Sequence, residues 1–162
     1  MFKRVLALSF TAVLVSGSAF AAGPDSTDAS QLQDAVTVAQ DALAALKGRF
    51  EGRPGYHARG ESVVVELGDH ANAYDKEILE KQLPRIEDYL VNASLKFGDA
   101  AQLLPSNEGT TIFYQGCADT LRAQRQVDVV LSKVKRSKNF KTADFDFIQS
   151  DIQQALADSK CR

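Results

Sequence analysis

The sequence predicts an all-α protein, a bundle of four or five helices whose C-terminal antiparallel helix hairpin is tied by a disulfide. Three observations lead to this fold class. Apolar residues recur at alternating spacings of three and four along most of the chain, which is the period of amphipathic helices. Turn-forming residues separate these stretches. The only two cysteines, Cys117 and Cys161, flank the last predicted turn symmetrically.

The first 21 residues have the pattern of an export signal. Lys3 and Arg4 precede a short apolar run, and Ala19-Phe20-Ala21 forms a small-x-small cleavage site. The apolar run is too short to span the hydrocarbon core of a bilayer, about 30 Å thick. We therefore expect cleavage after Ala21 and a periplasmic or secreted protein with no transmembrane segment. Residues 22–30 would be a disordered lead-in, and residues 31–162 a single helical domain.

The first predicted helix is followed by the most irregular segment of the chain. The helix carries one apolar stripe made of Leu32, Val36, Ala39, Leu43, Leu46 and Phe50. Residues 48–60 then contain four glycines and a proline, which exclude regular structure. This segment is either a linker or a ligand-binding loop, because it also contains forked donors and ring side chains, namely Arg49, Arg53, Tyr56, His57 and Arg59.

A second helical pattern begins after Ser62, a residue that suits a helix N-cap. Its apolar positions are Val64, Leu67, Ala71, Tyr74 and Ile78. The same rhythm resumes beyond Pro84 with Ile86, Leu90, Ala93, Phe97, Ala100 and Leu104. No turn residues precede Pro84, so we expect a kinked continuation of the helix rather than a reversal of the chain. The pattern ends before Pro105-Ser106-Asn107.

The last two helical patterns form the predicted hairpin, with its turn at residues 136–141. Thr142 would cap the second helix of the pair. Cys117 and Cys161 each lie 22 residues from Asn139 in the middle of the turn, so an antiparallel pair brings them to the same level, roughly 33 Å from the turn. In an oxidising compartment this favours a disulfide. Closing a loop of this length stabilises the fold by roughly 4 kcal/mol.

The chain offers no motif for catalysis, a cofactor or a metal. It lacks a G-x-S-x-G nucleophile pattern and an HExxH metal pattern, and both cysteines are better explained as a bridge. His70 and Tyr74 have helical spacing but are a poor ligand pair. After signal removal the formal net charge is −4, which argues against general nucleic-acid binding. We therefore expect no catalytic residues, no metal ligands and no cofactor.

One basic run stands out in this acidic chain. Residues 106–141 contain seven basic and three acidic side chains, and the basic residues Lys135, Arg136 and Lys138 lie at the predicted turn. Cations at a helix C-terminus complement its macrodipole, which is the structural explanation of the run. The alternative is a docking surface for an acidic protein or an anionic envelope surface. The oligomeric state stays open.

The hairpin resembles the plant invertase and pectin methylesterase inhibitor bundles, in which cysteines link exported antiparallel helices. The likeness covers the last third of the chain and ends in Ala155-Leu156-x4-Cys161. The family's N-terminal cysteine pair is missing here, and the spacing before the last cysteine differs. We expect a non-enzymatic bundle that binds another macromolecule as an inhibitor, adaptor or chaperone-like subunit. The alternatives are a bundle that binds a small ligand or metal, and an enzyme without a visible motif.

Overall fold

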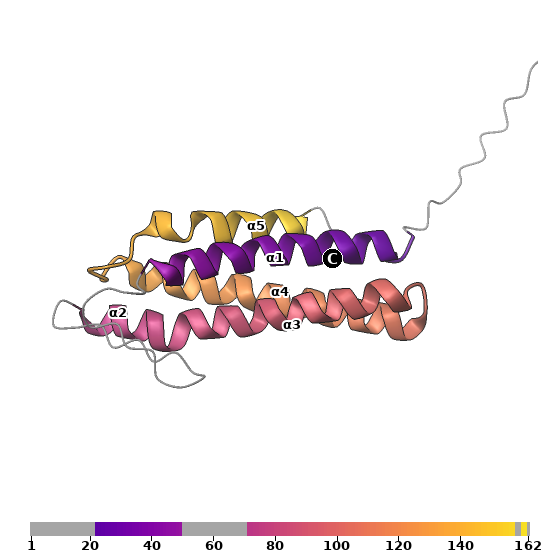
Figure 1. The fold of residues 1–162 in the computed structure, drawn as a ribbon, viewed down its shortest axis with the longest axis horizontal. Helices are drawn as coiled ribbons and strands as arrows, with labels where there is room; N and C mark the ends of the chain where they lie inside the picture. Colours follow the sequence, from indigo (N-terminus) through magenta and orange to yellow (C-terminus); the bar gives the residue numbers. More distant parts are fainter. Residues whose placement is uncertain (1–21, 50–70, 158–159, 162) are drawn as a thin grey trace, which may run out of the picture.

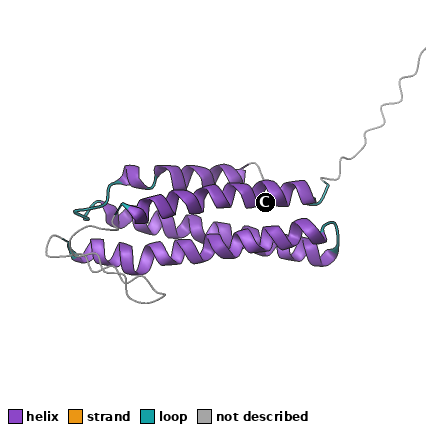
Figure 2. Ribbon diagram, viewed as in Figure 1, coloured by secondary structure: helices purple, strands orange, loops and turns teal. Residues whose placement is uncertain are grey.

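A computed structural model describes residues 22–49, 71–157 and 160–161 of the chain. These residues form a bundle of long helices, as Figures 1 and 2 show, and the described part contains no strand. The all-α fold class is therefore confirmed. In chain order the elements are α1 (Ser26–Gly48), α2 (Ala73–Glu77), the π-helical turn η1 (Ile78–Gln82), α3 (Leu83–Leu103), α4 (Asn107–Val134), the 3₁₀ turn η2 (Thr142–Asp144) and α5 (Asp146–Ala157).

The helices of the bundle alternate in direction. Helix α3 runs antiparallel to both α1 and α4, and α5 runs back along α1 and α4 (Figure 1). Helix α5 is shorter than α1, α3 and α4, and it packs more extensively against α1 than against α4. The last helix is thus held by the first helix of the chain as well as by its hairpin partner. Contacts between such distant segments are not visible in a local sequence pattern.

The predicted apolar stripes form the core. Between the helices lies one connected cluster of buried apolar side chains, because each stripe turns toward the bundle axis. The described members of the predicted α1 stripe are all buried, and so are those of α3 apart from the half-buried Leu104. Three phenylalanines are among the largest fully buried side chains: Phe97, Phe113 and Phe145.

Helix α1 begins earlier than the sequence analysis placed it. It starts at Ser26, inside the segment 22–30 that was expected to be a disordered lead-in. The reason is a reciprocal cap: the Asp25 side chain accepts from the backbone N–H groups of Thr27 and Asp28, while the Asp28 side chain accepts from the Asp25 N–H. This arrangement satisfies backbone donors that the first helical turn leaves unpaired.

The helix that contains Pro84 can be followed only from Ala73, after the predicted start at Ser62. Ser62, the expected cap, lies outside the described residues, and the described helix starts at Ala73 with Asn72 as its cap. From there α2, η1 and α3 follow one another without a break, as the kinked-continuation hypothesis expected. The π turn at Ile78–Gln82 comes directly before Pro84. A proline ring clashes with the carbonyl four residues earlier, and a widened turn relieves that clash.

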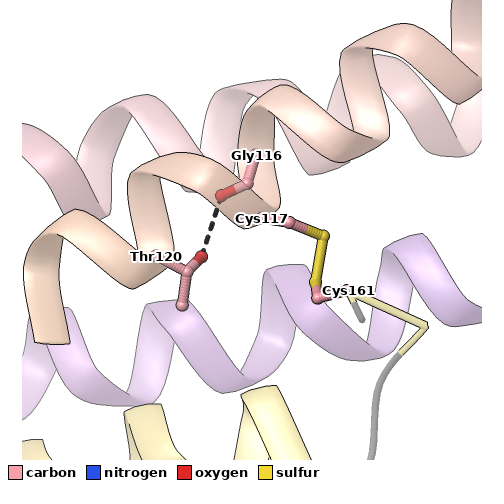
Figure 3. The surroundings of a disulfide bond; sticks show 4 residues. All are labelled: Gly116, Cys117, Thr120 and Cys161. Atoms are coloured by element: carbon pink, nitrogen blue, oxygen red, sulfur yellow. Dashed lines mark hydrogen bonds between the residues drawn. A yellow bond between two sulfur atoms is a disulfide. The ribbon is translucent and has the colours of Figure 1, made fainter.

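The Cys117–Cys161 disulfide is present, as predicted, with a Cα–Cα distance of 5.4 Å (Figure 3). Cys117 is buried in the middle of α4, whereas Cys161 lies beyond the end of α5. One turn further along α4, the Thr120 hydroxyl donates to the Gly116 carbonyl at 3.0 Å. The bridge therefore fixes the chain that follows α5 to the centre of α4.

Gly116 allows a close approach between α3 and α4, which leads to a first prediction. A Cβ atom at Gly116 would lie 2.8 Å from Cε1 of the buried Phe97 ring. We expect Gly116→Ala to lower the free energy of unfolding by about 1–2 kcal/mol, because overpacking of the core outweighs the better helix propensity of alanine. Urea denaturation followed by circular dichroism measures the effect.

Gly98 is the matched control for this substitution, since it is also a helical glycine. A Cβ atom there would meet only the side-chain end of Gln33, on the half-exposed side of α3, and that side chain can swing away. Gly98→Ala should be neutral or stabilise by up to about 1 kcal/mol. If both variants were stabilised alike, the close approach of Phe97 to Gly116 would not constrain the fold.

Candidate docking surface

The basic run predicted from the sequence lies at one end of the bundle. The end of α4, the turn after it, η2 and the start of α5 lie together there with the end of α1 and the start of α2 (Figure 1). We call the segment 135–141 the basic turn; its basic side chains are those of Lys135, Arg136, Lys138 and Lys141.

A buried carboxylate, that of Asp75 in α2, organises the basic turn. Asp75 is fully buried and accepts hydrogen bonds from the Ser137 hydroxyl, from the Lys138 N–H at 3.2 Å and from the Asn139 N–H at 3.0 Å. Its second oxygen accepts from the Asn72 N–H at 2.9 Å. The turn is therefore wrapped around a single side chain that lies more than sixty residues earlier in the sequence.

These contacts also explain why the Asp75 carboxyl group stays ionised although it is buried. Burial raises the pKa of a carboxyl group, because it penalises the charged form. At Asp75 the hydrogen bonds from Ser137, Asn72, Asn139 and Lys138 together outweigh burial, so its pKa is lowered from the ordinary value. The buried group is an anion whose charge is satisfied by donors of the turn.

Arg136 has structural partners of its own. Its guanidinium donates to the Tyr74 hydroxyl at 2.9 Å and lies 5.6 Å from the centre of the Tyr74 ring. The Tyr74 contact raises the pKa of Arg136. The Arg136 carbonyl accepts from the Asn72 side-chain amide at 2.7 Å. Of the three turn residues predicted to bind a partner, Arg136 thus also ties α4 to α2.

The lysines of the basic turn point to solvent. Lys135, Lys138 and Lys141 are all exposed, whereas the backbone N–H of Lys138 is held by Asp75. The N–H of Lys141 donates to the Asp144 carboxylate at 2.8 Å. The backbone is therefore held in the middle of the basic turn and at its end, while the lysine side chains are exposed. Such a surface presents positive charge without first having to order a loop.

Only one of the residues predicted in the segment 48–60 can be placed. The Arg49 guanidinium lies 2.8 Å from an oxygen of Asp144, so the end of α1 is joined to the turn η2 near the basic turn. Arg53, Tyr56, His57 and Arg59 lie outside the described residues. The choice between linker and binding loop therefore stays a hypothesis.

Polar pairs join α4 to the helix that runs from α2 to α3. Lys133 binds Glu77 at 2.7 Å and lowers the pKa of that carboxyl group. Further along the same seam, Gln126 donates to the buried Gln82, and the buried Asp119 binds both Lys96 and Arg122. The contacts of Gln82 and Asp119 satisfy buried polar groups at this seam, which is a structural role.

The described residues contain no cluster of side chains that is typical of a metal centre. No group of three or more His, Cys, Asp or Glu among them could hold a metal ion. The buried polar residues of the described part, which are Asp75, Gln82, Asp119 and Thr120, all have hydrogen-bond or ion-pair partners. Separately, none of the described helices is long and apolar enough to cross a bilayer.

Three grooves beside α5 open to solvent. Two run between α1 and α5 and have volumes of about 320 and 380 Å³, and one between α4 and α5 has a volume of about 360 Å³. The space between the helices is filled by apolar side chains instead. These three grooves are therefore on the outside of the bundle.

The residues that shape the basic turn are not apparent from the sequence pattern. In the sequence, Tyr74 belongs to the apolar stripe predicted after Ser62, and Asp75 is the polar residue next to it. One local signal could have found them: Asn72 and Asp75 have the spacing of a capping box, in which each side chain caps the other's backbone. The pairing of Asp75 with the turn has no local signal.

Searches of protein-family models, curated proteins and solved structures found no match to this chain. The resemblance of the last third to the plant inhibitor bundles therefore rests on the cysteine-linked hairpin alone.

Proposed function

We propose that the protein is an exported, non-enzymatic helical bundle that binds an acidic macromolecular partner through the basic turn. The observation that carries the proposal is the Asp75 network, which holds the backbone of residues 137–139 while the lysines around it stay exposed. A binding surface that is ordered in advance avoids the entropy of ordering a loop on association. Inhibitor, adaptor and chaperone-like subunit are the classes of role that fit.

Charge supports the same reading. The part of the chain from Asn107 to Lys141 has seven basic and three acidic side chains, whereas α1 and its cap carry the acidic residues Asp25, Asp28, Asp34 and Asp41. Within that part, α4 has three basic and three acidic side chains, so the excess positive charge lies on the basic turn. Complementary potentials of this kind raise association rates and orient partners.

The other two hypotheses have less support. A small-ligand site inside the bundle needs polar groups that await a ligand, yet the buried polar groups of the described residues are already paired. An enzyme needs a nucleophile, acid or base with an orienting partner in a cleft. The grooves beside α5 contain no such set.

A charge reversal that spares Arg136 tests the proposal. In Lys135→Glu/Lys138→Glu/Lys141→Glu, we expect association with the partner to slow by about tenfold or more at low salt, because electrostatic steering is removed. For the wild-type protein, binding should weaken as salt shortens the Debye length. Cross-linked pull-down from the exported proteins of the source organism identifies the partner, and stopped-flow or surface plasmon resonance then gives the rates.

The matched control reverses three exposed cations elsewhere, in Lys81→Glu/Arg85→Glu/Arg125→Glu. Both triple variants change the net charge equally, so a loss confined to the turn variant assigns binding to the basic turn. Equal capture of the same partner by wild type and the turn variant at low salt would refute the proposal. The basic residues would then be explained by the helix macrodipole and their structural contacts.

A further inference from the structure

The most exposed large apolar side chain among the described residues lies at the same end of the bundle. Phe147, in the first turn of α5, is 76% exposed, while its neighbours Phe145 and Ile148 are buried in the core. A single exposed apolar residue needs no explanation. Phe147 differs because it forms one wall of a groove.

The groove lies between the end of α1 and the start of α5, with a volume of about 380 Å³. Three alanines line it, Ala42 and Ala45 from α1 and Ala143 from η2, and their small side chains leave the space beside Phe147 open. This volume is within the range of sites that bind small ligands or side chains. An aromatic wall beside an apolar floor is typical of the anchor position of a protein interface.

Charged groups surround the groove and determine what fits it. Arg49 and Asp144 join its two sides at one end, and the Arg49 side chain is half-exposed, so the guanidinium has further N–H donors to offer. The chain immediately before the groove is the basic turn, with Lys141 next to η2. A chain that reaches the groove along this side passes the lysines first. Asp144 is paired with Arg49, so the excess positive charge on this side comes from the lysines of the basic turn, and charge complementarity there favours an acidic chain.

We infer that this groove, which we call the Phe147 groove, takes one large apolar side chain from an acidic peptide segment of the partner. The segment's carboxylates would face the basic turn and Arg49, while its apolar side chain packs against Phe147. The inference rests on the proposed function and deepens it, because it adds an apolar anchor to an electrostatic surface. Charged rims set orientation and association rate, and buried aromatic contacts hold the complex.

Two fluorescein-labelled peptides of alternating Glu and Asp test this, one with a central Phe and one with Ser in its place. Fluorescence anisotropy against the whole mature protein should show the Phe peptide binding about tenfold tighter or more. Phe147→Ala should remove most of that difference and leave weak, salt-dependent binding of both peptides. Leu95→Ala, at another exposed apolar position, should leave the difference unchanged.

The outcomes separate this inference from the proposed function. If both peptides bind wild type equally and binding falls with salt, the groove is not an anchor, while the electrostatic proposal stands. If the preference for Phe survives in Phe147→Ala, the anchor lies elsewhere and the inference is overturned. If neither peptide binds even at low salt, the inference about the Phe147 groove and the proposed function are both overturned. Thermal melts show that the variants are folded, since both side chains are exposed.

Discussion

Replacing both cysteines with alanine should lower the free energy of unfolding by about 4 kcal/mol, the largest single effect expected in this protein. The bridge spans 44 residues, and a cross-link of that length restricts the unfolded chain strongly. It also holds the chain beyond α5, where Lys160 donates to the Gly23 carbonyl at 3.0 Å and binds Asp28 at 2.9 Å. The Lys160–Asp28 ion pair is half-exposed, and such pairs contribute little to stability, so we expect the bridge to be the main attachment of this tail.

Urea denaturation of three samples checks this: the oxidised wild type, the wild type reduced with dithiothreitol, and Cys117→Ala/Cys161→Ala. The free energies of unfolding of the reduced wild type and of Cys117→Ala/Cys161→Ala should agree, and both should be lower than that of the oxidised wild type. Lys160→Ala is the control for the tail contact and should cost less than about 1 kcal/mol. A difference below about 1 kcal/mol between oxidised and reduced protein would mean that the helix packing alone holds the bundle together.

Asp75→Asn should have the second largest effect: we expect it to lower the free energy of unfolding by about 2–4 kcal/mol at neutral pH. The asparagine keeps the shape of the side chain but loses its charge and replaces one acceptor oxygen with an NH₂ group. That group would face N–H donors, namely those of Asn72, Lys138 and Asn139 or the hydroxyl of Ser137. Hydrogen bonds to a buried charge are among the strongest, and buried donors left without acceptors are costly.

The pH dependence of this loss has a defined sign. The pKa of Asp75 is lower in the folded protein than the ordinary value of about 3.9. Its contribution to stability is therefore fully present above pH 4, and it is lost as pH falls through the folded pKa. The stability difference between wild type and Asp75→Asn should shrink steadily below about pH 4. Urea melts at a series of pH values measure this.

Asp34→Asn is the matched control, because Asp34 is an exposed carboxylate of α1. It should change the free energy of unfolding by no more than about 0.5 kcal/mol. Hydrogen exchange adds a local measurement: in Asp75→Asn the amides of Lys138 and Asn139 should exchange faster than in wild type. Unchanged stability and unchanged exchange would show that Asp75 does not hold the turn.

Asp75→Asn also connects stability with the proposed function. The lysines of the basic turn keep their charges in this variant, but the backbone that orients them loses its acceptor. If preorganisation matters, partner affinity should fall even though the net positive charge around the turn has not decreased. The Lys135→Glu/Lys138→Glu/Lys141→Glu variant changes charge with the Asp75 contacts kept, so together the two variants separate the two contributions.

The sequence by itself determined the class of fold, most of the core and the disulfide. Leu32, Val36 and Leu43 recur with the helical period, and a stripe of that kind must turn inward wherever the helix packs. Cys117 and Cys161 could be paired because an antiparallel turn brings equidistant residues to one level. The stripes depend only on local periodicity, and the cysteine pairing depends only on the assumption that two helices joined by a short turn pack antiparallel.

Only the tertiary structure decided which polar and apolar side chains make the candidate surface. Asp75 is buried because the start of α2 happens to meet a turn more than sixty residues later, and Arg136 meets Tyr74 for the same reason. Phe147 is exposed because α5 packs on α1 with Phe145 and Ile148 facing inward. The free energy of a buried charge or an open groove depends on neighbours brought together by the whole bundle. No residue's own sequence context contains that information.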